Sequence, residues 1–171
     1  MAATFVVEDG SGISAANAYI SEAAADQYFD DVGQATTWDA VTSKEQCIRD
    51  GTRYLDARYG PYWRGRRANI DNVLDWPRTN VDDDDNHSVS STALPQGLLD
   101  ACCEAAIRSD SETLTPDVTD EGMIVRRTQK AGDLEETVEY AGGLDQLKSY
   151  TIIERLLHDL IDTNGIPMER A

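Results

Sequence analysis

The sequence SKEQCIRDGTRYLDARYGPYWRGRRANIDNVLDWPRT, residues 43–79, joins a predicted helix to a loop rich in arginine and aromatic residues. Ser43 and Gln46 form a capping-box pattern, in which a hydroxyl and an amide bond the free N–H groups at a helix start. Apolar residues then recur at three-, four- and seven-residue steps, which is typical of a helix with one buried face. Gly60 and Pro61 end the pattern, because glycine suits the left-handed C′ position and proline cannot continue the hydrogen-bond ladder. The stretch therefore predicts a central helix followed by a loop that packs on its own domain or on a partner.

Charge is distributed unevenly along the chain. The formal net charge is −17, yet residues 41–80 carry eight of the 15 basic side chains against five acids. Residues 1–40 carry seven acids and no Lys or Arg. A basic island in an acidic chain favours self-complementary assembly, in which the island of one copy meets an acidic segment of the next. A set of arginines that is simply exposed to solvent on one face of the domain explains the same pattern, so both interpretations stay open.

Length and composition predict a single globular domain, residues 1–171. The chain has 40% hydrophobic and 27% charged residues, which is a globular composition. A pI near 4.2 argues against a dedicated nucleic-acid binder, since affinity for a polyanion comes mainly from neutralising phosphates. No apolar run reaches the ~20 residues that span a bilayer, and the first residues lack the pattern of a signal peptide. Cys47, Cys102 and Cys103 lie in helical patterns, which favours buried reduced thiols over disulfides or metal ligands.

The remaining elements predict a mainly α fold: about four helices in a small bundle, with a β-hairpin and short N-terminal strands. The strands are expected at 4–7 and 18–20, and a helix capped by Ser21 is expected to end near Gly33. A further helix opens at 94–97, where proline is tolerated at an early position. Residues 122–141 change to a β-type pattern and predict a hairpin, and 144–161 predict a last amphipathic helix. The final segment, 162–171, is polar with an apolar trio, which fits either a frayed end or a docking tail.

Candidate chemistry is sparse. Four consecutive aspartates, 82–85, precede His87, but the glycine and distal glutamate of a calcium loop are missing, which favours a solvated loop over a metal site. His158 follows a leucine pair on the last predicted helix and is interpreted as a helix-surface or partly buried residue rather than a general base. None of the common nucleophile, zinc-protease, phosphate-loop or dinucleotide motifs occurs. The sequence therefore predicts a protein that is not an enzyme and has no cofactor.

Three runs resemble one family of tailed-phage proteins: ANAYISEAAADQYF at 16–29, TRYLDARYGPYWRGRR at 52–67 and LDWPRT at 74–79. Members are often labelled DnaT-like single-stranded-DNA-binding proteins and look like head–tail connector, or adaptor, proteins. The connector resemblance implies a ring of twelve copies in the virion neck, beneath the portal protein, made in the host bacterial cytoplasm. Its partners would be further copies, the portal, and a stopper or tail protein. Double-stranded DNA would pass through the ring without specific binding, and no membrane would be involved.

The resemblance also implies contact residues for a neighbouring subunit or the portal. They are arginines and aromatics of the central loop, two arginines of the hairpin and the apolar trio of the tail: Tyr62, Trp63, Arg64, Arg66, Arg67, Trp76, Arg78, Arg126, Arg127, Ile166, Pro167 and Met168. Tyrosine, tryptophan and arginine are the residues enriched at interface hot spots. The alternative is a single-stranded-DNA-binding protein of phage replication, because the same loop combines aromatic rings for base stacking with cations for phosphates. The sequence favours the connector, since Trp63 and Trp76 flank a helix end and a proline, which is typical of packed aromatics.

Overall fold

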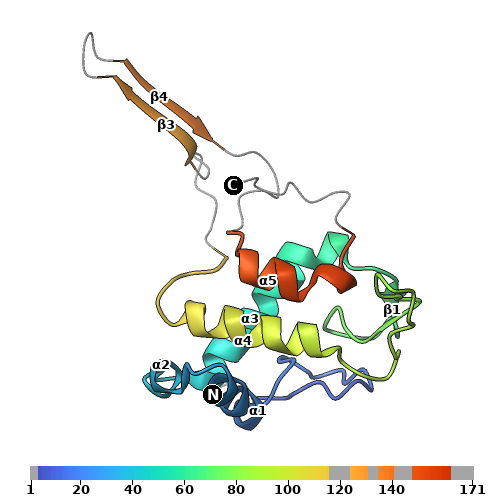
Figure 1. The fold of residues 1–171 in the computed structure, drawn as a ribbon. Coiled ribbons are helices and arrows are strands. Elements are labelled where there is room, and N and C mark those ends of the chain that lie inside the picture. Colours follow the sequence, from blue (N-terminus) through green and yellow to red (C-terminus); the bar gives the residue numbers. More distant parts are fainter. Residues whose placement is uncertain (1–3, 116–123, 131–134, 141–147, 163–171) are drawn as a thin grey trace. The chain divides into compact units, whose positions relative to one another are not determined.

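A computed structural model describes residues 4–115, 124–130, 135–140 and 148–162. The chain divides into two compact units, which are described separately: residues 1–114 with 149–171, and residues 115–148. In the larger unit, the helices are α1 (Glu22–Asp31), α2 (Ala35–Asp39), α3 (Lys44–Tyr59), α4 (Gln96–Ser109) and α5 (Thr151–Leu156). Short 3₁₀ turns, η1 (Gly60–Tyr62) and η3 (His158–Leu160), follow α3 and α5. Two very short strands, β1 (Arg66–Arg67) and β2 (Arg78–Thr79), pair between α3 and α4 in the chain (Figure 1).

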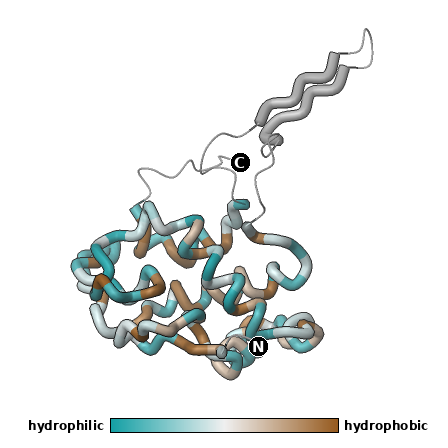
Figure 2. The backbone as a smooth tube through the Cα atoms, turned by 180° about the vertical axis from the view of Figure 1, so that it is seen from behind, coloured by the Kyte–Doolittle hydropathy of each residue, from teal (hydrophilic) through white to brown (hydrophobic). Residues whose placement is uncertain are grey.

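The core of the larger unit is built on the contact between α3 and α4. α4 also contacts α1 and α5, and α1 contacts α2 and α3. Ile48 and Leu55 of α3 are fully buried, and brown hydrophobic segments recur along the helices in Figure 2. Gly51 allows the close approach of the two helices: a Cβ there would lie 2.9 Å from the Cys102 carbonyl oxygen and 2.9 Å from the Ala106 nitrogen. The three cysteines are buried and free, as the helical pattern predicted.

α1 and α2 form a small layer fixed by one aromatic pair. Ser21 caps α1, since its hydroxyl accepts a hydrogen bond from Ala24 N at 3.2 Å. Phe29 stacks on Trp38 of α2 with ring centroids 4.6 Å apart. The Trp38 indole N–H donates to Asp26 Oδ1 at 2.7 Å, so the ring is held at both its face and its edge. The sequence patterns did not predict the short helix α2 that carries Trp38.

The smaller unit contains the predicted hairpin. β3 (Ile124–Lys130) pairs antiparallel with β4 (Glu135–Tyr140), with an irregularity between Ile124 and Arg126. The predicted span, 122–141, therefore brackets both strands. Residues 131–134, which join them, lie outside the described part of the chain.

The prediction of a mainly helical fold with a hairpin is confirmed, and several local expectations change. The N-terminal strands reduce to an isolated bridge between Val7 and Ala18. The last helix, expected over 144–161, is described only as α5 and η3, and residues 144–147 lie outside the described part. Ser43 precedes α3 but makes no side-chain capping bond, and the Gln46 amide pairs with Arg49 and Asp50. Within the described residues, no helix is long and apolar enough to cross a membrane.

Candidate nucleic-acid interface

The arginine loop, defined here as residues 64–79, is closed at its base by the two-stranded pair β1–β2. Arg66 lies opposite Thr79 and Arg67 opposite Arg78 in the antiparallel register. Gly65 makes the turn into β1 with φ 68°, where a side chain would be strained and would meet the Thr79 backbone. Residues 68–77 are therefore joined to a short, defined base.

Arg78 anchors this base from inside the protein. The residue is 8% exposed, and its guanidinium donates to three backbone carbonyls: Arg64 O at 2.8 Å, Gly65 O at 3.0 Å and Asp75 O at 3.2 Å. Burial lowers the pKa of Arg78 from its ordinary value. Its donors are thus used to close the loop, and this arginine is not presented to a partner at the surface.

A polar network joins the loop to α3 and to the N-terminal segment. Arg67 Nε donates to Asp75 Oδ1 at 2.9 Å, and Asp75 N donates to Asp56 Oδ2 at 3.2 Å. The Tyr19 hydroxyl donates to Asp56 Oδ1 at 2.5 Å and accepts from Trp76 N at 3.3 Å. Burial raises the pKa of Asp56 to about 7, while the pKa of Tyr19 also rises well above its ordinary value through burial and the nearby Asp56 charge. Tyr19, Asp56 and Asp75, one from each of the three sequence runs quoted above, therefore hold the loop in place.

The two tryptophans of the loop region are core residues. Trp76 is 0% exposed and Trp63 is 6% exposed. Their rings meet edge to face at 5.8 Å, and Trp63 also contacts the Tyr59 ring at 5.9 Å. Trp63 forms a backbone bridge with Ile161 after η3, which covers it from the C-terminal side. Neither indole can offer a face to a nucleic-acid base in this conformation, whereas Tyr62 is half-buried.

The solvent-exposed side chains in and beside the loop include arginines and two aliphatic residues. Arg66 and Arg67 are exposed, and the Arg66 side chain has no hydrogen bond or ion pair with any residue that the structure describes. Ile70 is 92% exposed and Val73 is 58% exposed. Val73 lines a pocket of ≈ 390 Å³ together with Arg53 of α3, whose side chain is 69% exposed. Sequence reasoning did not single out Ile70, Val73 or Arg53, although the run of arginines drew attention to the loop.

Arg64 differs from its neighbours because it links three segments. Its Nη2 donates to Asp84 Oδ1 at 2.6 Å, its Nη1 to Asp82 O at 3.1 Å and its Nε to Ile161 O at 3.2 Å. The side chain is held between the aspartate run and the segment after η3. It is therefore less available to an incoming phosphate than Arg66.

The other predicted contact residues lie on the hairpin and the tail. In the register of β3 and β4, Arg126 is opposite Glu139 and Arg127 is opposite Val138. Acidic residues of β4 also lie opposite Gln129 and Lys130, so the hairpin sequence balances its charges. Ile166, Pro167 and Met168, with all of the predicted docking tail except Asp162, lie outside the described residues.

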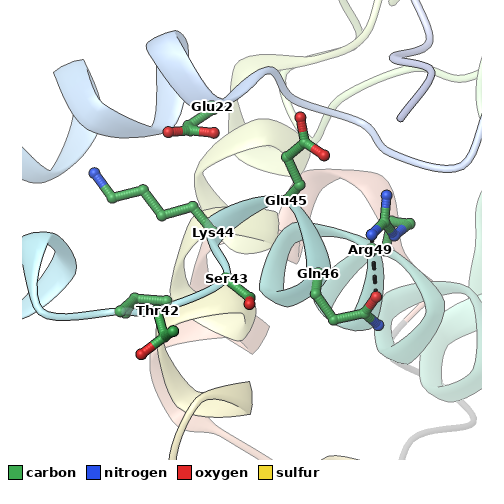
Figure 3. A pocket seen from close by; sticks show the side chains of 8 residues that line it. Glu22, Thr42, Ser43, Lys44, Glu45, Gln46 and Arg49 are labelled. Carbon is green, nitrogen blue, oxygen red and sulfur yellow. Dashed lines mark hydrogen bonds between the residues drawn. The ribbon is translucent and has the colours of Figure 1, made fainter. Parts of the chain in front are cut away.

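A second pocket, of ≈ 600 Å³, lies at the start of α3 (Figure 3). Its lining includes Glu22 and Glu45 as well as Lys44 and Arg49, so charges of both signs face it. Lys44 is occupied by Asp26 at 2.7 Å, and Arg49 Nη2 donates to the Gln46 side-chain oxygen at 3.1 Å, the dashed line in the figure. This pocket shows no preference for an anion.

The chain belongs to the family described as "Putative DnaT-like ssDNA binding protein", whose model matches residues 3–171. Comparison with curated proteins gives no match, and comparison with solved structures gives none either.

This family membership corrects the connector interpretation. The family is described by single-stranded-DNA binding, so the prediction of a virion head–tail connector that forms a ring beneath a portal is wrong. The family description favours the alternative of the sequence analysis, a single-stranded-DNA-binding protein. The predicted partners and location of the protein are not tested by these findings and stay predictions.

Proposed function

We propose that this protein binds single-stranded DNA, weakly and with little sequence preference, through the exposed residues of the arginine loop, 66–71 and 73. The observation that carries the proposal is the placement of Arg66 and Arg67 on a fixed two-stranded base beside the exposed Ile70 and Val73. Membership of a family described by single-stranded-DNA binding supports the same conclusion. The protein is proposed to act by binding and not as an enzyme.

The way in which the loop contacts DNA follows from which of its side chains are exposed to solvent. Arg66 is the phosphate ligand, and Arg67, whose guanidinium is paired with Asp75, adds its half-exposed positive charge. Arg53 of α3 is a further exposed cation. The indoles are buried, so base stacking on tryptophan does not contribute. Ile70 and Val73 offer apolar contact to base faces, which every base can accept, and this explains why little sequence preference is expected.

The charge of the chain limits the affinity. With a formal net charge of −17, most of the surface repels a polyanion, and only the local arginines attract it. Each phosphate neutralised on a single strand contributes about −0.7 to the slope of log K against log salt concentration. Two or three arginine contacts therefore predict a slope of roughly −1.4 to −2.1. Binding should be measurable at low salt and largely lost near physiological salt.

A pair of charge-reversal variants tests the proposal. Arg66→Glu and the control Arg155→Glu, an exposed arginine on α5, change the net charge by the same amount. Anisotropy of a fluorescein-labelled oligo(dT) of about 30 nucleotides in low salt measures both. Arg66→Glu should weaken binding by about tenfold, whereas Arg155→Glu should change it by no more than about twofold. Equal weakening in both variants would mean that only net charge matters and would refute a defined site.

A further inference from the structure

Three metal-ligating side chains from two distant parts of the chain meet on the surface of the larger unit. Asp84 lies in the aspartate run after β2, whereas His158 and Asp159 lie in η3 after α5. One ligand atom from each lies within 4.8 Å of the other two, and all three residues are exposed. We propose that Asp84, His158 and Asp159 together bind a divalent transition-metal ion of the Zn²⁺ class.

The distances fit such an ion. Zn²⁺ binds imidazole nitrogen and carboxylate oxygen at about 2.0–2.2 Å in a tetrahedral arrangement, which places neighbouring ligand atoms roughly 3.3–3.5 Å apart. His158 Nδ1 lies 3.1 Å from Asp84 Oδ2 and 3.4 Å from Asp159 Oδ1. Two of the three edges of the site thus have nearly the required length before any adjustment.

Without a metal ion, the imidazole cannot serve both carboxylates at once. Nδ1 of His158 carries at most one hydrogen, yet carboxylate oxygens from both Asp84 and Asp159 face it. Only one of them can accept that hydrogen, and the two carboxylates repel each other. A divalent ion at this point accepts the imidazole lone pair and both carboxylates together. The high negative charge of the chain attracts such an ion.

Backbone contacts hold the two halves of the site. An Asp82–Ser88 bridge closes the aspartate loop, inside which the Asp83 carboxylate accepts from His87 N at 2.7 Å. Arg64 N donates to Leu160 O at 3.0 Å and so fixes the end of η3. Asp82 and Asp83 therefore make hydrogen bonds within the aspartate loop, whereas Asp84 faces η3.

Arg64 gives Asp84 the kind of support that metal-binding carboxylates have. Its guanidinium binds Asp84 Oδ1 at 2.6 Å and leaves Oδ2, the oxygen nearer His158, for the ion. One nitrogen and two carboxylate ligands suit Zn²⁺ better than Ca²⁺, which prefers six or more oxygens. Three protein ligands leave a fourth position for water. The proposal does not depend on DNA binding.

Calorimetric titration of the full chain with ZnCl₂ at pH 7.5, after treatment with a chelator, tests the site. His158→Ala removes the nitrogen ligand. His87→Ala is the matched control because it removes the other histidine of the chain, which is exposed in the aspartate loop. We expect saturable binding of one ion per chain, at least about tenfold weaker in His158→Ala and in Asp84→Asn, and changed by no more than about twofold in His87→Ala. At pH 5.5 binding should weaken, since a protonated imidazole cannot bind a metal.

Three results would overturn the proposal. One is the absence of saturable binding by the wild-type chain. The second is binding by His158→Ala with wild-type affinity, which would place the ion elsewhere. The third is equal loss in His87→Ala and His158→Ala, which would indicate that zinc associates with the acidic surface in general.

Discussion

Replacing Trp76 distinguishes a core residue from a DNA-stacking residue. The side chain is 0% exposed and packs edge to face on Trp63 at 5.8 Å, so Trp76→Ala removes a large ring from the core. Such truncations cost about 3–5 kcal/mol, which is a large part of the ~5–15 kcal/mol that stabilises a typical domain. With a urea m-value of about 2 kcal/mol/M, the midpoint of unfolding should fall by roughly 1.5–2.5 M. Circular dichroism at 222 nm measures this transition.

Two further variants make the test specific. Trp76→Phe retains most of the ring, and Nε1 of Trp76 has no hydrogen-bond partner among the described residues, so the cost should fall to about 1–2 kcal/mol. Ile70→Ala truncates a side chain that is 92% exposed and should change stability by no more than about 0.5 kcal/mol. The reasoning would be refuted if Trp76→Ala unfolded within about 1 kcal/mol of wild type but lost its affinity for single-stranded DNA.

Three further perturbations test the core that supports the loop. Gly51→Ala places a methyl group 2.9 Å from backbone atoms of Cys102 and Ala106, so urea unfolding should show a loss of about 1–3 kcal/mol despite the better helix propensity of alanine. Glu8, 4% exposed, accepts three backbone N–H bonds at 2.7–2.9 Å; Glu8→Gln turns one acceptor into a donor and should cost about 2 kcal/mol, which thermal unfolding measures. The pKa of Asp56 rises from 3.8 to about 7 on folding, so its contribution to stability is complete below about pH 4 and is lost as pH rises through 7, by up to ~4 kcal/mol. Asp56→Asn should remove this part of the pH dependence between pH 4 and 8, and an unchanged profile would contradict the assignment.

The elements that sequence reasoning found are those with strong local signals. α3 begins and ends where the apolar periodicity and the Gly60–Pro61 pair predicted, and the hairpin was found from its β-type pattern. α2 was missed because five residues are too few for a periodic signal. The capping box at Ser43 is not formed: the Ser43 side chain makes no cap bond, and the Gln46 side chain pairs with residues of its own helix.

The site was harder to predict because loop residues acquire their roles from distant contacts. An aromatic ring in a loop can pack inward or meet a partner, and the choice for Trp63 depended on the segment near Ile161, almost a hundred residues later. The proline after Trp76 was the available local sign of inward packing. In the same way, the aspartate run alone did not indicate the proposed metal site, because the proposed nitrogen ligand, His158, comes from another part of the chain.

The most direct test of the account is one titration with two signals. Oligo(dT) is added to the protein at low salt while DNA anisotropy and intrinsic tryptophan fluorescence are recorded together. The chain has three tryptophans, Trp38, Trp63 and Trp76, and all are buried. We predict a salt-sensitive rise in anisotropy with little change in tryptophan emission, because phosphates meet the arginine loop and bases do not reach the indoles. No rise in anisotropy would contradict the proposed function, and strong quenching of tryptophan would contradict the proposed mode of binding.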